Sequence, residues 1–425
     1  MFYEEKSRKI PVTGEYDVLV AGAGPAGFAA ALAAARQGTK TLLVEQQNCV
    51  GGMATSGAMS HWVGNCDSKL YHELLSRSVA LRDEISTPNL EEKFIDTEQL
   101  KGLMLQMLSE AGVSVMLYTF VSDVILDQEK IAGIIVENKS GRQAIYAKTV
   151  IDATGDGDVA AKAGVPYYKG REDDEKMQPV TLMFKVGGVD YGKAVFLYGF
   201  EDTYETEKGE LQALAREHIP YPAGHVLLYP SPLPGVVACN MTNCVEVDGT
   251  KEQDLTKAEL LCRKQMPQVL QFLREFVPGY ERCFLLSSAS LIGVRETRHF
   301  EGLSKLTEED ILAARYFDDW VVKGAIFNFD VHNITGAGLD KTGLQRKFPQ
   351  TEGYTIPYGC LLPQRIENLL LCGRNISGTH MAHSNYRAMP ICVGIGEAAG
   401  VAAAISVKNG VLVKEVTAAE IQQIL

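Results

Sequence analysis

The segment from Tyr16 to Glu45 constrains the fold of this chain more than any other stretch. Residues 17–20 are a short apolar run, which is typical of a buried parallel strand. A glycine-rich turn follows at 22–27, then a run of strong helix formers, and then a second strand at 41–44 that leads into the acid. This order of strand, glycines, helix, strand and acid predicts a βαβ unit that binds a dinucleotide, rather than an isolated glycine-rich turn.

Each part of the G-x-G-x-x-G motif has a physical role in that prediction. Gly22 permits a tight turn, Gly24 allows the main chain to approach a pyrophosphate, and Gly27 allows the helix to pack close to the strand. The helix N-terminus offers unpaired N–H groups to the same pyrophosphate. The carboxylate of Glu45 can accept hydrogen bonds from a ribose hydroxyl pair.

The segment after Glu45, residues 46–57, is rich in small side chains. It is either a flexible surface loop or a loop that runs along the cofactor toward its reactive end. Its position directly after the acid favours the second interpretation, because small residues suit a close approach of the backbone. His61 follows and is a candidate to reach the reactive ring, although a single histidine is commonly structural.

Residues 113–147 alternate like strands, which predicts a β-meander inserted before the nucleotide sheet resumes. Two later segments return to nucleotide-binding character. The strand at 149–152 ends in small and acidic residues at 153–158, and an open α/β sheet gathers its ligand groups at such carboxyl ends. A second buried strand, 368–371, leads through Gly373 into a Gly/Ala-rich helix at 391–407. The N-terminal dipole of that helix can stabilise negative charge on a reduced ring.

The composition limits the class of protein. A chain of 425 residues needs two domains or one large composite domain, and 46% apolar with 22% charged residues is typical of a soluble globular protein. A net charge of −12 argues against nucleic-acid or anionic-membrane partners. We find no apolar run that would span a membrane and no signal peptide, so we expect a cytoplasmic protein. Nine scattered cysteines fit no metal or disulfide framework.

Together these segments resemble the FAD-dependent oxidoreductases of the glutathione-reductase-like flavoprotein superfamily. The runs at 291–298 and 354–358 add to the likeness, which is weakest at about 170–280. The resemblance implies an α/β fold with a split Rossmann-like FAD-binding domain, at 1–164 and 349–425, and an inserted α+β cap or substrate domain at 165–348. We see no second G-x-G-x-x-G motif, so no built-in NAD(P) domain is expected.

The same resemblance implies that FAD lies extended, with adenosine at Glu45, pyrophosphate at the glycine-rich turn and flavin near the start of the 391–407 helix. The residues expected to bind FAD are Gly22, Gly24, Pro25, Ala26, Gly27, Glu45, Gln46, Gly51, Gly52, Met53, Val121, Ala153, Thr154, Gly155, Asp158, Gly373, Arg374, Pro390 and Gly394.

Arginines and one histidine in the region 295–332 are candidates for the chemistry. Arg295 and Arg298 either clamp a substrate carboxylate or tie the two domains together by salt bridges. Asp330 and His332 share one side of an extended segment, so that the acid can raise the basicity of the imidazole, unless both lie on a solvated strand edge.

The histidines form a second set of candidates. His380 and His383 meet if their segment is helical, and they directly precede the helix expected to face the flavin. Their spacing suits a metal, but no third ligand is evident, so no metal site is predicted. His61 remains a fourth candidate, either as a base or as a point of covalent flavin attachment.

The sequence predicts an enzyme that carries out a two-electron oxidation of a small polar organic substrate, at a C–OH or C–N group, in the cleft between the two domains. The electrons would pass to oxygen or to another, unidentified acceptor. One alternative is a fumarate-reductase-like reduction of an activated C=C bond that uses Arg295 or Arg298. Another is a non-catalytic flavin-bound redox sensor or scaffold. The sequence leaves room for a homo-oligomer.

Overall fold

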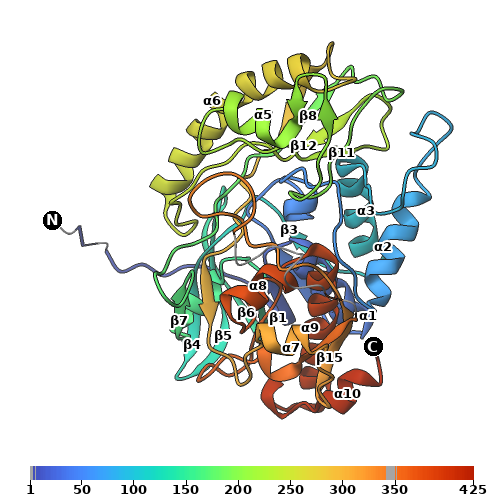
Figure 1. Cartoon of the computed structure of the whole chain (residues 1–425). Coiled ribbons are helices and arrows are strands. Elements are labelled where there is room, and N and C mark those ends of the chain that lie inside the picture. Colours follow the sequence, from blue (N-terminus) through green and yellow to red (C-terminus); the bar gives the residue numbers. More distant parts are fainter. Residues whose placement is uncertain (1–2, 5, 341–349, 351) are drawn as a thin grey trace.

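A seven-stranded sheet forms the base of the molecule in the computed structural model, which describes residues 3, 4, 6–340, 350 and 352–425 (Figure 1). Its strands are β1 (Val12–Ala21), β2 (Thr41–Val44), β3 (Ser114–Met116), β4 (Phe120–Asp127), β5 (Lys130–Asn138), β6 (Gly141–Asp152) and β17 (Leu369–Leu371). The strand order is β3-β2-β1-β6-β5-β4, and β17 also pairs with β6. The pairs among β1, β2, β3, β6 and β17 are parallel, whereas β4 and β5 form an antiparallel ribbon at one edge. This is the predicted α/β class with a Rossmann-like core.

The carboxyl ends of four of these strands meet at one edge of the sheet. Ala21 pairs with Val44 and with Asp152, and Asp152 pairs in turn with Leu371. Segments separated by more than 200 residues therefore end side by side. In an open α/β sheet, this is the edge at which ligand groups gather.

Two helices that follow these strand ends pack closely on each other, α1 (Pro25–Arg36) and α9 (Met389–Asn409). A Cβ atom on Gly396 would lie 2.1 Å from the carbonyl oxygen of Ala26, and one on Gly400 would lie 2.2 Å from that of Ala30. Glycine at both positions therefore lets the two backbones touch. Among the described residues, only α9 is long and apolar enough to cross a membrane, but 94% of its apolar window is buried in the protein, as in a core helix.

A smaller antiparallel sheet and two helices form a cap over the large sheet, at the top of Figure 1. The strands are β8 (Phe184–Gly187), β11 (Leu228–Pro230), β12 (Val237–Cys239) and β13 (Phe284–Ser288), in the order β11-β12-β8-β13. The helices are α5 (Leu211–His218) and α6 (Glu252–Phe276). A short ribbon of β9 (Glu205–Thr206) and β10 (Gly209–Glu210) precedes α5.

The remaining elements surround these two sheets. The helices are α2 (Lys69–Val79), α3 (Thr97–Glu110), α4 (Asp158–Ala163), α7 (Glu308–Leu312), α8 (His380–Tyr386) and α10 (Ala418–Gln422). Two antiparallel pairs complete the fold: β7 (Tyr167–Lys169) with β14 (Arg298–Phe300), and β15 (Trp320–Ala325) with β16 (Tyr354–Pro357).

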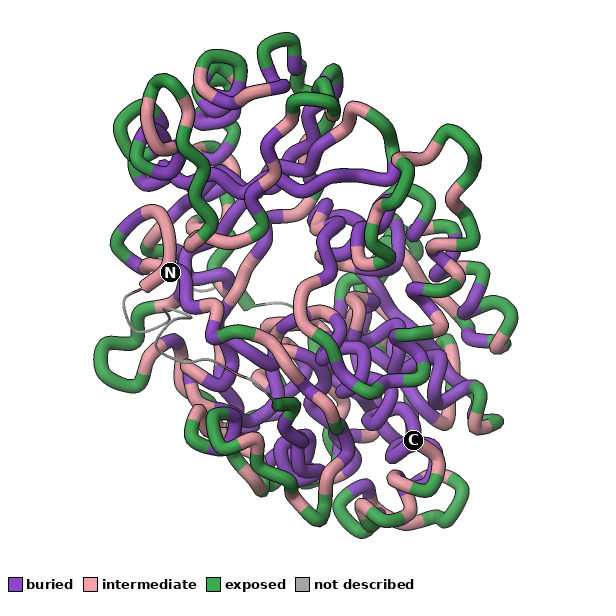
Figure 2. Tube along the Cα trace, turned by 45° about the vertical axis from the view of Figure 1, so that its right-hand side comes forward, coloured by how far each residue is buried: buried purple, intermediate pink, exposed green. Residues whose placement is uncertain are grey.

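Buried side chains form two hydrophobic cores, which Figure 2 shows as buried segments in both halves of the molecule. One core draws on residues 18–165 and 300–421, and the other on residues 180–292 together with Ala58 and Phe94. The residues from 300 to 329 thus pack with the large sheet. The domain boundaries near 164 and 348 stay a prediction, and the second of them lies outside the described residues.

The structure corrects one part of the predicted strand pattern. The alternating segment from 113 to 147 predicts a meander that precedes a separate strand at 149–152. Instead β3 is a parallel edge strand beside β2, and β6 runs without interruption from Gly141 to Asp152. The first half of β6 pairs with β5 and its last residues pair with β17. One long strand therefore joins the antiparallel ribbon to the nucleotide sheet.

Candidate functional site

A cavity of about 590 Å³ lies along the carboxyl edge of the large sheet. This volume is within the range that holds cofactors and drug-sized ligands in proteins. Its opposite wall comes from α6 and from residues 290–294. The predicted cofactor residues that line it are Gly22, Gly24, Pro25, Ala26, Glu45, Gln46, Gly52, Met53, Val121, Ala153, Thr154, Gly155, Asp158, Gly373 and Arg374.

The glycine-rich turn has the geometry that close approach of a phosphate requires. Gly22 has a φ of +90°, and a Cβ atom on Gly27 would lie 1.9 Å from the carbonyl oxygen of Gly22. Gly27 therefore supports the turn rather than lining the cavity. A Cβ atom on Gly24 would meet no atom within 4 Å, because this residue faces the open cavity. The N-terminus of α1, which begins at Pro25, thus presents bare backbone to a ligand.

Glu45 closes one end of the cavity. One oxygen of its carboxylate accepts a hydrogen bond from the N–H of Ala23 at 2.7 Å, and the other accepts one from the N–H of Gln47 at 2.8 Å. Burial raises the pKa of this carboxyl group, and the two backbone donors oppose that rise. The held carboxylate keeps lone pairs free for donors such as the hydroxyl groups of a ribose.

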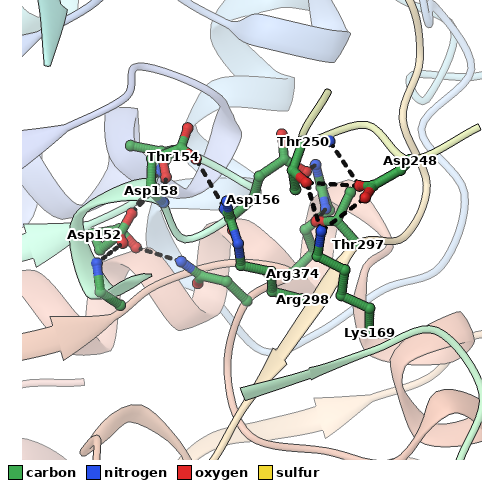
Figure 3. Close-up of polar contacts among 12 residues, drawn as sticks. Asp152, Thr154, Asp156, Asp158, Lys169, Asp248, Thr250, Thr297, Arg298 and Arg374 are labelled. Carbon is green, nitrogen blue, oxygen red and sulfur yellow. Dashed lines mark hydrogen bonds and ion pairs between the residues drawn. The ribbon is translucent and has the colours of Figure 1, made fainter. Parts of the chain in front are cut away.

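Asp152 anchors the loop that follows β6, as Figure 3 shows. One oxygen accepts hydrogen bonds from the N–H and the hydroxyl of Thr154 at 3.1 and 2.6 Å, and the other accepts from the N–H of Ala160 at 2.7 Å. Burial raises the pKa of Asp152 to about 6. The side chain is fully enclosed, so its task is to hold the 153–158 loop in place beside the cavity.

Arginines tie this loop to the C-terminal strand and to β14 (Figure 3). Nη2 of Arg374 donates to Oδ1 of Asp156 at 2.5 Å, and the hydroxyl of Thr297 donates to the same oxygen at 2.6 Å. Nη1 of Arg298 donates to the carbonyl oxygen of Asp156 at 2.7 Å and to Oδ1 of Asp158 at 2.9 Å. Arg298 therefore ties segments of the protein together, as in the second interpretation given above, instead of standing free to clamp a substrate carboxylate.

Three further predicted cofactor residues do not line the cavity. Gly51 has a φ of +106° and donates its N–H to the carbonyl oxygen of Ala23 at 2.7 Å, so it shapes the loop. The carbonyl oxygen of Pro390 accepts a hydrogen bond from the thiol of Cys66 at 3.1 Å. A Cβ atom on Gly394 would lie 3.0 Å from the same sulfur, so this face of α9 points away from the cavity. A helix start assigned from sequence does not tell which of its residues faces the ligand.

A second group of polar residues lies where the cap meets the large sheet. We call it the interdomain polar cluster, and it consists of Gln178, Arg295, Asp330, His332 and Arg387. Nε2 of His332 lies 3.3 Å from Oδ2 of Asp330, as their spacing predicts, and Nη2 of Arg387 lies 3.0 Å from the same oxygen. Arg387 alone among the five lines the 590 Å³ cavity. Asp330 is partly exposed, with 23% of its side chain accessible.

Burial and like charges set the protonation states in this cluster. Burial, aided by the charge of Arg295, lowers the pKa of His332 to about 4, and Asp330 only partly opposes this, so the imidazole is neutral at pH 7. Burial and the nearby Arg387 lower the pKa of Arg295 to about 10, which leaves it charged. Burial opposes ionisation of Asp330, but His332 and the two arginines hold its pKa below the usual value.

Arg295 and Arg387 have different surroundings. Arg295 donates to the carbonyl oxygen of Pro179 at 2.6 Å and to the hydroxyl of Thr181 at 2.9 Å, and neither partner is charged. Sequence reasoning missed Arg387. Its position gave no clear signal, because it lies between the C-terminal end of α8, which favours a cation, and the N-terminal end of α9, which disfavours one.

His380 and His383 lie together on α8, as predicted, but neither lines the cavity. Nδ1 of His380 lies 2.5 Å, and Nε2 of His299 2.8 Å, from the same oxygen of Glu296, whose second oxygen accepts the N–H of Gln178 at 3.0 Å. Glu296, His299 and His380 each bring one ligand atom to within 4.8 Å of the others, so a third ligand does exist. The two separations are those of hydrogen bonds to one buried carboxylate, while Nδ1 of His299 and Nε2 of His380 have no partner among the described residues.

His61 is enclosed by aromatic rings instead of facing the cavity. Its ring stacks on Phe94 with 4.6 Å between centroids and lies 4.9 Å from the ring of Tyr229. Burial lowers its pKa to about 3. All nine cysteines are free and buried, including Cys49 and Cys66 near the glycine-rich loop.

Comparisons with known proteins agree with this geometry. A family described as FAD dependent oxidoreductase matches residues 17–425. Thiamine thiazole synthases from Methanococcus vannielii and Sulfolobus acidocaldarius are 30% and 32% identical over 149 and 166 residues. These matches cover 33% and 35% of this chain but only 56% and 59% of those proteins, so the chain spans little more than half the length of the curated relatives it matches.

Solved structures show the same fold at low identity. A geranylgeranyl bacteriochlorophyll reductase-like protein from Thermoplasma acidophilum has a TM-score of 0.51 at 13% identity, with 96% of this chain and 82% of that chain covered. A triple mutant of a flavin-dependent brominase has a TM-score of 0.53 at 13% identity, with 92% and 81% covered. A myxobacterial chondrochloren halogenase has a TM-score of 0.51 at 12% identity, with 97% and 78% covered. The likeness concerns the fold.

Proposed function

This chain belongs to the FAD dependent oxidoreductase family and is an enzyme that uses FAD, and we propose that it removes two electrons from a C–OH or C–N group of a small polar organic substrate. The observation that carries the proposal is a chain of contacts from Arg387 through Asp330 to His332. It joins the wall of the large cavity to a buried, neutral imidazole. The reaction would take place where the cavity meets the interdomain polar cluster.

The residues that line the cavity would hold FAD in an extended form. The carboxylate of Glu45 would accept hydrogen bonds from the ribose of the adenosine, and the bare backbone at Gly24 would contact the pyrophosphate. Gly373, Met389 and Cys392 line the cavity near the start of α9 and would border the flavin. The N-terminal end of α9 favours negative charge at that position.

When bound, FAD supplies the acceptor for a hydride. The protein must orient the substrate and take the proton that leaves its oxygen or nitrogen. His332 suits this task because its imidazole is neutral at pH 7 and its Nε2 faces Asp330, which leaves Nδ1 for the substrate. The carboxylate of Asp330 would stabilise the imidazolium that forms.

The electron and proton balance is that of an alcohol or amine oxidation. The substrate carbon gives up a hydride, its hydroxyl or amino group gives up a proton to His332, and a C=O or C=N bond remains. Oxygen or another two-electron acceptor must then take the electrons from the cofactor. The partners of this protein would therefore be a small-molecule substrate and an electron acceptor.

One observation favours a second candidate, reduction of the C=C bond of an unsaturated acid. Arg295 and Arg387 both lie near Asp330, so cations outnumber anions in the interdomain polar cluster. Such an excess of positive charge favours binding of a substrate carboxylate, whether the substrate is oxidised or reduced. Arg298, the other arginine expected to serve this role, is bound to Asp156 and Asp158 instead.

The test is an anaerobic screen with the purified FAD-loaded protein. Alcohols, hydroxy acids and amines are added in turn, and loss of the flavin absorption is followed. We expect one of these classes to bleach the flavin. If none does, while an unsaturated acid reoxidises the chemically reduced protein, the oxidation is refuted in favour of the reduction. If neither direction gives turnover, both the oxidation and the reduction are refuted for these classes of compound.

A further inference from the structure

Four buried polar atoms around the interdomain polar cluster have no hydrogen-bond partner among the described residues. They are Nε of Arg387, Nε2 of Gln178, Nδ1 of His225 and Oδ1 of Asn240. Native proteins pair nearly all such atoms, so each one that stays unpaired calls for a ligand or water.

These atoms belong to one continuous region. The ring of Phe200 contacts both His225 and His332, with centroid separations of 4.9 and 4.8 Å. Oε1 of Gln178 accepts the N–H of His332 at 3.1 Å. Nε2 of His225 lies 2.9 Å from the carbonyl oxygen of Asn240. Phe200 therefore borders both His225 and His332, and Gln178 borders His332 from another side.

The unpaired atoms divide into donors and acceptors. Nε of Arg387 and Nε2 of Gln178 carry only hydrogens to donate. Nε2 of His225 must donate to the carbonyl oxygen of Asn240, so its Nδ1 is left with a lone pair, and burial lowers the pKa of this imidazole to about 3. Oδ1 of Asn240 is an acceptor as well. A ligand that pairs all four atoms would therefore carry an acceptor group for Arg387 and Gln178 and a hydroxyl donor for His225 and Asn240.

The charge balance identifies the acceptor group. Arg295 and Arg387 face one carboxylate, that of Asp330, while His332 is neutral. Glu296 follows Arg295 in the sequence but turns toward His299 and His380. An unbalanced buried cation is costly, so an anion is favoured here. A protonated amine beside two arginines would be repelled, which disfavours a zwitterionic amino acid.

We propose that the substrate is a hydroxy acid, whose carboxylate accepts hydrogen bonds from Arg387 and Gln178 and whose hydroxyl groups donate to His225 and Asn240. This rests on the proposed oxidation and narrows it to a secondary or primary alcohol beside an anionic group. The hydroxyl that reacts loses its proton to His332 and its carbon loses a hydride to FAD, so a keto or aldehyde acid is the product. Arg387 is then a substrate-binding residue, positioned by Asp330.

The test measures binding apart from turnover. The FAD-loaded protein is titrated with two matched series, glycerate, glycerol and propionate, and gluconate, sorbitol and hexanoate. The flavin difference spectrum and the melting temperature report binding. In at least one series we expect the hydroxy acid to bind about ten- to hundredfold more tightly than the neutral polyol or the plain acid, which each lack one set of partners.

Variants assign the contacts. Arg387→Gln should weaken binding of the hydroxy acid to the level of the polyol, and Asn240→Ala should weaken it toward the level of the plain acid, with FAD content unchanged in both. Arg36→Gln, a surface residue paired with Glu73, is the control and should bind normally. Equal binding of polyol and hydroxy acid in both series overturns the proposal, as does loss of FAD from Arg387→Gln. Selective binding without any flavin reduction supports this site and refutes the oxidation instead.

Discussion

Oδ2 of Asp330 lies 3.0 Å from Nη2 of Arg387, which also donates to the carbonyl oxygen of Asp330 at 2.7 Å. Both bonds fix the guanidinium between the start of α9 and the segment that carries His332. The same carboxylate oxygen is 3.3 Å from Nε2 of His332. One carboxylate thus orients both the cation that lines the cavity and the imidazole of the proposed base.

Replacement of His332 tests the base. His332→Ala should slow anaerobic reduction of the flavin by roughly 10²- to 10⁴-fold. It should keep its FAD, because His332 does not line the cavity. In the wild type the rate should be level near neutral pH and fall as the pH drops toward about 4, since the base is protonated below its pKa. Stopped-flow spectroscopy measures both. His72→Ala, at an exposed histidine, is the control, and a wild-type rate in His332→Ala would remove the base assignment.

Substitutions at two glycines of the same turn should have different effects, loss of FAD in one case and loss of stability in the other. Gly24→Val should fold but lack FAD, because its side chain has no protein atom within 4 Å of the new Cβ and would occupy the cavity. Gly27→Ala should lose stability, because its Cβ would lie 1.9 Å from the carbonyl oxygen of Gly22. Melting curves and the flavin-to-protein absorbance ratio separate the two effects. A fully loaded Gly24→Val protein would refute the pyrophosphate assignment.

Local patterns predict the nucleotide sheet and its cofactor turn, because the glycines, the strand ends and Glu45 lie within about one βαβ unit. They also predict that Asp330 lies beside His332, two residues away. They do not predict contacts between side chains that lie far apart in the sequence. Arg387 meets Asp330 across 57 residues, and His380 meets Glu296 across 84. Pairing at that distance depends on how the cap sits on the sheet, which no periodicity in the sequence encodes.

Glu296 should be a determinant of stability rather than of the chemistry. Its side chain is fully buried, and its hydrogen bonds with His299 and His380 hold its pKa well below the usual value although burial opposes this. Glu296→Gln should lower the free energy of unfolding by about 3–5 kcal/mol, measured by urea denaturation. His380→Ala should lower it too, and combining the two changes should cost less than the sum. Glu73→Gln, on the surface, is the control.

Flavin reduction should stay near the wild-type rate in His380→Ala, because His380 contacts Glu296 and does not line the cavity. A large loss of rate with FAD retained would restore this histidine as a candidate base. A stoichiometric metal ion in the purified protein, lost on Glu296→Gln, would show that the three side chains form a metal site rather than a hydrogen-bonded group.

His61 should make the protein sensitive to acid. Burial, with a smaller effect of Lys93, lowers the pKa of the folded imidazole to about 3, whereas the unfolded chain titrates near 6.5. Between these values the unfolded state binds a proton that the folded state does not, so stability is lost as the pH falls through this window. The loss is about 1.4 kcal/mol per pH unit.

His61→Phe keeps the stack on Phe94 and removes the proton, so its stability relative to the wild type should rise at that slope below pH 6 and be flat above pH 7. The other buried histidines are present in both proteins and cancel in the difference. Urea denaturation from pH 8 to pH 4 measures it, with His72→Phe as the exposed control. Parallel stability curves for His61→Phe and the wild type would mean that His61 is protonated in the folded protein, and that its aromatic enclosure admits water.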